Sequence, residues 1–311
     1  MIEFSVVREA STERSRNVIA MHNRLKIEKS IEYYFQVLCD QISVIAWLLS
    51  SAHRSGGMLK HNYRRYGSPY VVEFFRRYNR TGLQEAEQLV LGELATKLPG
   101  MNMLDVGVGA GRTTHHFAHL TRCYVGTDYS RRMLGVANVS SQRFIQNSFV
   151  VCDARALPLR EAFFDFILFS YNGIDYMAHE DRLKALTEIT RVGRRGCIFL
   201  FSAHNLYSID SLFTAKPTLD PLKLLNQIGR TIILRVLYDV RELKKCKHVT
   251  ICDDPRLGLL VYYVAPEEQI RQLLDSGFKD VEVVTLSDDR ISNSAELASL
   301  RDRWLNYLCH T

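Results

Sequence analysis

The chain has 311 residues, of which 47% are hydrophobic and 24% charged, and its formal net charge is +6. This composition is ordinary for a folded globular protein, so it excludes a chain that is disordered throughout. The most apolar stretch, residues 42–49, is far too short to span a bilayer. The length suits an α/β core of about 200 residues with accessory segments.

Residues 1–98 are predicted to form a helical cap. Apolar residues recur at helical spacing from Leu83 to Leu94, and Pro99-Gly100 then ends the helix. Within this cap, residues 54–80 hold seven Lys or Arg and one acidic residue, with tyrosines between them. Such a segment is either a solvated helix face or a surface that follows phosphates. The apolar helices expected within residues 31–52 could join two copies as a homodimer.

After Gly100 the pattern changes to short apolar runs that alternate with helical stretches. The expected strands are 102–106, 122–127, 148–152, 164–169 and 197–202. This alternation predicts a parallel sheet with right-handed crossovers, which forms the core over residues 99–204. Residues 205–256 do not follow this alternation of strands and helices, and we interpret them as a helical insertion that covers the substrate.

The alternation of strands and helices returns at the end of the chain. Residues 259–264 and 281–286 are expected strands, and Pro266 and Gly277 bound a helix between them. Residues 257–311 therefore complete the core, with 287–311 as a terminal helix or tail. The predicted fold class is α/β, a seven-stranded Rossmann-like sheet with six parallel strands and the last one reversed.

The most informative stretch joins the first core strand to the following helix. It runs from Asn102 to Arg112 and places Gly107, Gly109 and Gly111 at alternate positions. Glycines let a backbone approach a ligand, and a helix N-terminus favours negative charge. A dinucleotide-binding fingerprint needs glycine where Arg112 stands, so that interpretation fits less well.

Three aspartates follow neighbouring strands. Asp105 lies in the first strand, Asp128 ends the second and Asp153 ends the third. The carboxyl ends of parallel strands share one edge of the sheet, where ligands bind in such folds. An acid after the second strand can accept hydrogen bonds from both hydroxyls of a ribose.

Four blocks together resemble the class I, Rossmann-like, S-adenosylmethionine-dependent methyltransferases of the bacterial small-molecule type. These blocks are Leu104–Thr114, Val125–Ser130, Cys152–Ala154 and Phe164–Ser170. The block from Tyr262 to Leu286 also resembles the reversed final hairpin of that family. The resemblance implies that S-adenosyl-L-methionine is the cofactor, and it does not cover the first 80 residues.

The resemblance also implies a set of cofactor contacts. Asp128 would bind the ribose, Tyr129 and Met133 the faces of the adenine, and Arg112 the methionine carboxylate. Val108 departs from the family, which often has Cys or a small residue there. The complete set is Asp105, Gly107, Val108, Gly109, Gly111, Arg112, Asp128, Tyr129, Met133, Asp153, Ala154 and Ser170.

Candidate acceptor-side residues follow the fourth and fifth strands. Methyl transfer needs positioning and exclusion of water, and a base only when the acceptor is protonated. His204 could be that base, which favours an oxygen acceptor over nitrogen or carbon. The substrate-binding candidates are Tyr171, Asn172, Tyr176 and Asn205.

Methyl transfer from S-adenosylmethionine to a small molecule is therefore the predicted function. An RNA methyltransferase that uses residues 54–80 is one alternative. However, the polar residue and two prolines of amino-directed nucleic-acid methyltransferases are missing after the fourth strand. A protein that keeps the cofactor fold only as a scaffold is the other alternative.

Two further expectations concern the environment of the protein. The seven cysteines form no C-x-x-C pair, and Met1 is followed by charged residues without an apolar run, so we expect a cytoplasmic location. We predict no metal, because His115 and His119 stand four apart on a helix with no evident third ligand.

Overall fold

The computed structural model describes residues 57–78, 81–140, 147–255, 257–284, 290–291 and 294–311. The helices and the homodimer contact predicted for residues 31–52 lie outside them. The longer helices are α2 (Met58–Tyr66), α3 (Pro69–Tyr78), α4 (Glu85–Leu94), α6 (Arg131–Ser140), α7 (His179–Val192), α8 (Pro221–Leu237) and α10 (Pro266–Asp275). No helix among these described residues is long and apolar enough to cross a membrane.

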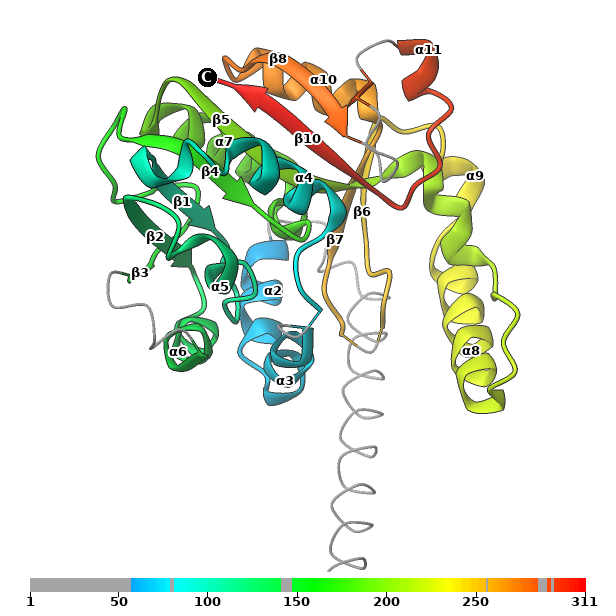
Figure 1. Ribbon diagram of the computed structural model, residues 1–311. Helices are drawn as coiled ribbons and strands as arrows, with labels where there is room; N and C mark the ends of the chain where they lie inside the picture. Colours follow the sequence, from blue (N-terminus) through cyan, green and yellow to red (C-terminus); the bar gives the residue numbers. More distant parts are fainter. Residues whose placement is uncertain (1–56, 79–80, 141–146, 256, 285–289, 292–293) are drawn as a thin grey trace, which may run out of the picture.

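The fold is mixed α/β, with helices around one central sheet (Figure 1). Its described strands are β1 (Asn102–Val106), β2 (Cys123–Asp128), β3 (Asn147–Val151), β4 (Phe164–Phe169), β5 (Gly193–Asn205), β6 (His248–Ile251), β7 (Val261–Val264), β8 (Lys279–Val284), β9 (Arg290–Ile291) and β10 (Trp304–His310). The main order is β3-β2-β1-β4-β5-β10-β8-β9, and β6 and β7 form a hairpin beside β5. The strands from β3 to β5 run parallel, whereas β10 is antiparallel to both β5 and β8.

The middle strands are mostly apolar because helices cover both faces of the sheet. In β4, Ile167 and Phe169 pack with Leu186 and Ile189 of α7. The alternate residue Phe166 belongs to the cluster on the opposite face, which includes Val90 and Leu94 of α4. Because successive side chains point to two covered faces, both sets are apolar except Asp165, whose carboxylate accepts a hydrogen bond from the Asn102 N–H.

The end of the sheet differs from our prediction. The predicted reversed strand 281–286 corresponds to β8, which runs parallel to β5, and the reversed strand is β10, within the segment predicted as a helix or tail. The predicted count of seven strands is also wrong, since the described residues form ten. The strand predicted at 259–264 is β7, which pairs with β6 and only with the last residues of β5.

The physical reason is that β10 is buried on both faces between two strands. Leu305, Tyr307 and Cys309 belong to one core cluster and Leu308 to the other. In such a short apolar run the spacing of the hydrophobic residues does not distinguish a strand from a buried helix.

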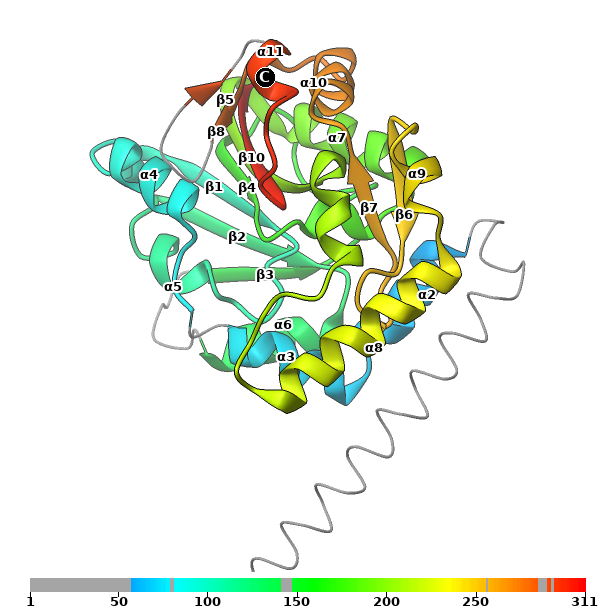
Figure 2. The ribbon, with the colours of Figure 1, turned by 90° about the vertical axis from the view of Figure 1, so that its right-hand side faces the viewer.

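Residues 205–256, predicted as a helical insertion, contain both helices and a strand. They form a 3-10 helix, η4 (Leu206–Phe213), then α8, the short α9 (Val240–Leu243) and β6. Figure 2 shows α8 in front of the body and α2 near one of its ends. The domain boundaries proposed from the sequence stay predictions.

Candidate active site

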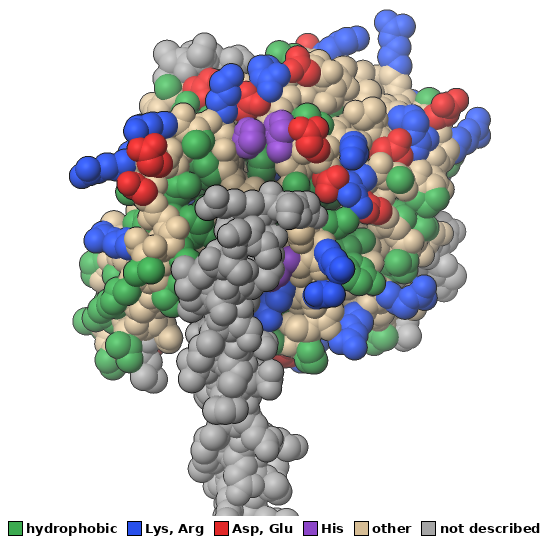
Figure 3. Space-filling model, turned by 180° about the vertical axis from the view of Figure 1, so that it is seen from behind, with side chains coloured by type: hydrophobic (Ala, Val, Ile, Leu, Met, Phe, Trp, Pro, Cys, Tyr) green, Lys and Arg blue, Asp and Glu red, His purple; other side chains and the backbone are tan. Residues whose placement is uncertain are grey.

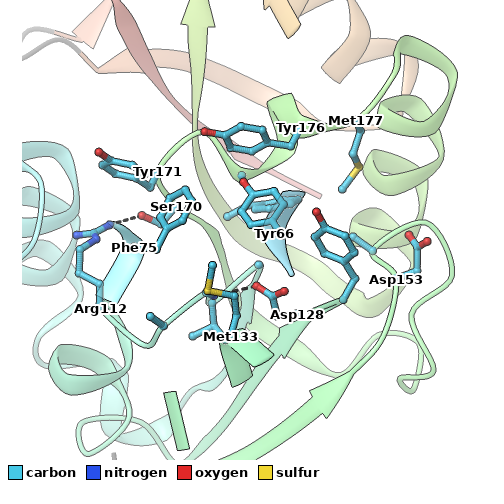
Figure 4. Close-up of a pocket in the computed structure, with 18 of the residues that line it drawn as sticks. Tyr66, Phe75, Arg112, Asp128, Met133, Asp153, Ser170, Tyr171, Tyr176 and Met177 are labelled. Carbon is cyan, nitrogen blue, oxygen red and sulfur yellow. Dashed lines mark hydrogen bonds between the residues drawn. The ribbon is translucent and has the colours of Figure 1, made fainter. Parts of the chain in front are cut away.

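A cavity lies where β1, β2 and β4 end (Figure 4), and side chains of α2 and α3 also line it. Its charged side chains come from the ends of the strands and from the loops after them, while α2 and α3 add Leu59, Tyr66 and Phe75. The complete lining is Leu59, Tyr66, Phe75, Gly107, Val108, Gly109, Ala110, Arg112, Asp128, Tyr129, Met133, Asp153, Ala154, Phe169, Ser170, Tyr171, Gly173, Tyr176 and Met177. Ten of the predicted cofactor residues and two of the predicted substrate residues are therefore together at one cavity.

The glycine-rich loop after β1 has a backbone that only glycine adopts easily. Gly107, Gly109 and Gly111 have φ angles of 64°, 57° and 90°. A Cβ atom at Gly107 would lie 2.7 Å from the Phe169 ring. The two glycines that line the cavity therefore bring bare backbone to its wall.

Asp128 connects this loop to the end of β2. Its Oδ2 accepts a hydrogen bond of 2.9 Å from the Gly109 N–H, and its Oδ1 accepts one of 2.7 Å from the Ser130 N–H. Burial raises the pKa of Asp128 to about 6, although the two backbone hydrogen bonds oppose this shift. A carboxylate fixed at the cavity wall can accept hydrogen bonds from a ligand on its remaining lone pairs.

Arg112 is held in place by an acid that the sequence analysis did not single out. Its guanidinium donates two hydrogen bonds of 2.7 Å to Glu87 of α4, a buried ion pair, and one of 2.7 Å to the Gly82 carbonyl. It also donates to Ser170 Oγ, as Figure 4 shows. The available signal was the position of Glu87, three residues after Gln84, whose N–H donates to its carboxylate across 2.8 Å.

Aromatic rings form much of the remaining wall. Tyr66 of α2 contacts the rings of Phe75, Tyr129 and Tyr176 at centroid distances of 5.5, 5.6 and 5.3 Å. The tyrosines of residues 54–80 looked equivalent in the sequence, whereas the structure places Tyr66 in the cavity wall. Six of the lining residues are aromatic, so flat apolar groups suit this space.

Three predicted residues lie behind the cavity wall. The Asp105 carboxylate accepts a hydrogen bond of 2.7 Å from the Tyr124 hydroxyl and another from Thr113, which fixes the loop from below. The Asn172 N–H donates to Ser202 Oγ across 2.8 Å. Gly111 also lies outside the lining. Asp153 does line it, and both of its oxygens accept hydrogen bonds from Arg155.

His204 and Asn205 also lie outside the described lining. Asn205 Oδ1 accepts from the Tyr207 N–H, and its amide donates to the Leu300 and Asp302 carbonyls, so it fixes η4 and the chain before β10. His204 is buried, with Nδ1 2.8 Å from Asp175 Oδ2.

The ring of Trp304 lies between His204 and Tyr171, a residue of the cavity wall. Its centroid is 6.1 Å from the His204 ring and 5.3 Å from the ring of Tyr171, which lines the cavity. The catalytic role of His204 stays a prediction.

Comparisons with known proteins agree with this geometry. Residues 103–196 match the family model described as "Methyltransferase domain". Over 99 residues the chain is 32% identical to demethylmenaquinone methyltransferase of Renibacterium salmoninarum. That match covers 32% of this chain and only 39% of the relative's length.

Among solved structures, the 1,6-didemethyltoxoflavin-N1-methyltransferase of Burkholderia thailandensis was crystallised with S-adenosylhomocysteine. It is 15% identical, with 84% of this chain and 91% of that chain covered and a TM-score of 0.51. An S-adenosylmethionine-dependent methyltransferase from Clostridium acetobutylicum is 14% identical over 73% of this chain and 90% of that chain, with a TM-score of 0.50. These likenesses show the fold.

Proposed function

We propose that this chain, whose residues 103–196 are a methyltransferase domain, is an S-adenosylmethionine-dependent methyltransferase that acts on a small molecule. The observation that carries the proposal is the arrangement of three charged residues at one cavity. Figure 4 shows Arg112 and Asp153 at opposite sides, with Asp128 between them. A carboxylate, a ribose and an adenine follow one another in the same order along S-adenosylmethionine.

The residues present fit this cofactor chemically. Asp128 offers carboxylate lone pairs to the ribose hydroxyls, and Tyr129 and Met133 offer apolar contact to the adenine. Arg112 is the cation at the methionine end, where the ligand carboxylate would compete with Glu87 for the guanidinium. The bound cofactor supplies an activated methyl group on its sulfonium.

The protein itself has to position the acceptor and exclude water. Tyr66 and Phe75 cover the cavity from α2 and α3, and Tyr171 and Tyr176 extend its aromatic wall. Holding the acceptor beside the methyl group supplies most of the rate in such a transfer. The wall favours a small, flat and largely apolar acceptor.

Oxygen is the acceptor atom that we propose, because His204 is arranged as a base would be. Asp175 is fully buried, and it accepts a hydrogen bond from the His204 main-chain N–H across 2.6 Å and contacts Nδ1. A carboxylate at Nδ1 favours the tautomer with a free lone pair on Nε2, the form that accepts a proton.

The first test is the pH dependence of S-adenosylhomocysteine binding. Because the pKa of Asp128 is raised to about 6, the carboxylate gains a proton as the pH falls through 6 and loses acceptor capacity. The dissociation constant should be flat above about pH 7 and then rise by up to about tenfold per pH unit below 6. Isothermal calorimetry measures it.

Asp128→Asn is the control for this pH dependence. It should bind more weakly at every pH and lose most of the rise below pH 6, since the titrating group is gone. An unchanged slope in this variant would assign the titration to another group and contradict the role of Asp128.

The second test concerns His204. A panel of small phenols and aromatic amines is screened for S-adenosylhomocysteine formation, and phenols should be the better acceptors. With a phenol, His204→Ala should lower kcat by about 10²–10⁴ while binding of S-adenosylhomocysteine stays within about twofold. Equal kcat values, or activity only with amines, would contradict the proposed oxygen acceptor.

A further inference from the structure

Exposed apolar side chains concentrate on one helix. Nine large hydrophobic residues are exposed among the described residues, and five of them lie between Leu219 and Val236. Four of these form a stripe on α8, which we call the α8 stripe: Leu225, Ile228, Ile232 and Val236, at 68%, 41%, 58% and 74% exposure. In Figure 3 hydrophobic side chains gather at the left-hand edge, where α8 lies.

The spacing shows that this stripe is a second apolar face of α8. Steps of three, four and four residues keep its side chains on one side of a helix. On the other side, Leu234 is fully buried and packs against η4 residues such as Ile209 and Leu212. A helix that is apolar on two faces normally has two neighbours.

The charges on α8 indicate what kind of neighbour fits. Residues 221–237 include Lys223, Arg230 and Arg235 and no acidic residue. Lys223 and Arg230 lie eleven and four residues before Leu234 and therefore on its side of the helix, so only Arg235 flanks the stripe. An apolar partner with an acidic residue for Arg235 fits this face of α8.

One segment of this chain has that composition. Residues 31–52 are rich in large apolar side chains, and their charged residues are Glu32 and Asp40, without Lys or Arg. They lie outside the described residues. As a helix they would be about 33 Å long, which is enough to cover the roughly 25 Å of α8.

The start of the described chain is also at the right place. Met58, the first residue of α2, packs in a buried cluster against which Leu237, the last residue of α8, also packs. Residue 52 is separated from Met58 by residues 53–57, and five residues span at most about 18 Å. Residue 52 can therefore lie beside the C-terminal end of α8, and residues 31–52 can run from there along the helix.

We propose that residues 31–52 pack along the α8 stripe of the same chain, so that α8 and α2 are joined by a third helix. Each of its turns would place apolar side chains against Leu225, Ile228, Ile232 and Val236. Because α2 supplies Tyr66 to the cavity wall, the added contact would also steady the cover of the cavity.

Trp47 reports directly on this packing. The chain has two tryptophans, so Trp304→Phe leaves Trp47 as the sole emitter in the full-length protein. In that background, Val236→Asp places a charge in the stripe. Val139→Asp is the matched control, since Val139 of α6 is 68% exposed and lies outside the stripe.

We expect blue-shifted Trp47 emission that resists iodide quenching in the Trp304→Phe background and in Val139→Asp. Val236→Asp should shift the emission to longer wavelength and raise the quenching constant severalfold. Ile45→Asp, in the segment itself, should change the Trp47 emission and quenching in the same way. Combining it with Val236→Asp should change them little further, because both substitutions break the same contact. Circular dichroism confirms that each variant is folded.

Three outcomes would overturn the proposal. Identical Trp47 spectra in Val236→Asp and Val139→Asp would show that the segment does not touch the stripe. A spectrum that changes on dilution, together with a dimeric mass that Val236→Asp abolishes, would assign the stripe to a second copy. A blue shift that develops only on adding phosphatidylglycerol vesicles would assign it to a lipid surface.

Discussion

Asp175→Ala is expected to destabilise the protein by about 3–5 kcal/mol, which lowers the melting temperature by roughly 10 °C. Asp175 and Arg182 form an ion pair whose side chains are both fully buried. Removing the carboxylate leaves the Arg182 charge in the interior without its partner and removes the acceptor of the His204 N–H. Chemical denaturation and differential scanning calorimetry measure the effect.

Asp210→Ala is the matched control for this prediction. Asp210 also forms an ion pair, with Lys244 at 2.6 Å, but both side chains are about half exposed. Exposed pairs contribute less than about 1 kcal/mol, so this variant should melt within a few degrees of wild type. Equal losses in the two variants would contradict the account of the buried pair.

Asp128→Ala is expected to weaken S-adenosylhomocysteine binding by on the order of a hundredfold or more. The carboxylate would accept hydrogen bonds from the ribose, and bonds to a charged group contribute about 1.5–3 kcal/mol each. The variant also removes the acceptor that holds the Gly109 and Ser130 N–H groups, so the loop loses its connection to β2.

Asp153→Ala is the corresponding control at the other end of the cavity. Asp153 is partly exposed, and its carboxylate is already engaged by Arg155. Its loss should weaken binding by no more than about tenfold. If Asp153→Ala cost more than Asp128→Ala, the assignment of the ribose to Asp128 would be wrong.

The first five strands could be predicted because each contains a short apolar run between helical stretches, and the resemblance to methyltransferases is confirmed over residues 103–196. Strands β7 and β8 were predicted as well, whereas β10 was not. The reversed strand is β10 and not β8, and nothing local in Trp304–His310 shows that this segment inserts between β5 and β8. Pairing of that kind is a long-range property.

Some residues of the site could likewise be predicted from the sequence, and others could not. Gly107 directly follows β1 and Asp128 is the last residue of β2, so both could be assigned from the sequence to the edge where the parallel strands end. Glu87 and Phe75 reach the cavity or its arginine from separate helices, and only tertiary packing brings them there.

The basic segment 54–80 has a partly structural explanation. Arg76 and Arg77 both pair with Glu73 on the surface of α3, and the Arg65 Nε donates to the Leu257 carbonyl. In Figure 3 Lys and Arg are mixed with Asp and Glu in the upper part of the face, whereas Lys and Arg predominate in the lower part. RNA binding through this segment stays an untested alternative.

The most direct test of the central claim is calorimetric titration of wild-type protein with S-adenosylhomocysteine at pH 7.5, with NAD⁺ titrated in parallel. We predict one site per chain with a micromolar dissociation constant for S-adenosylhomocysteine and no measurable heat from NAD⁺. Binding of NAD⁺, or absence of binding by S-adenosylhomocysteine to folded protein, would contradict the assignment of the cavity between Arg112 and Asp153.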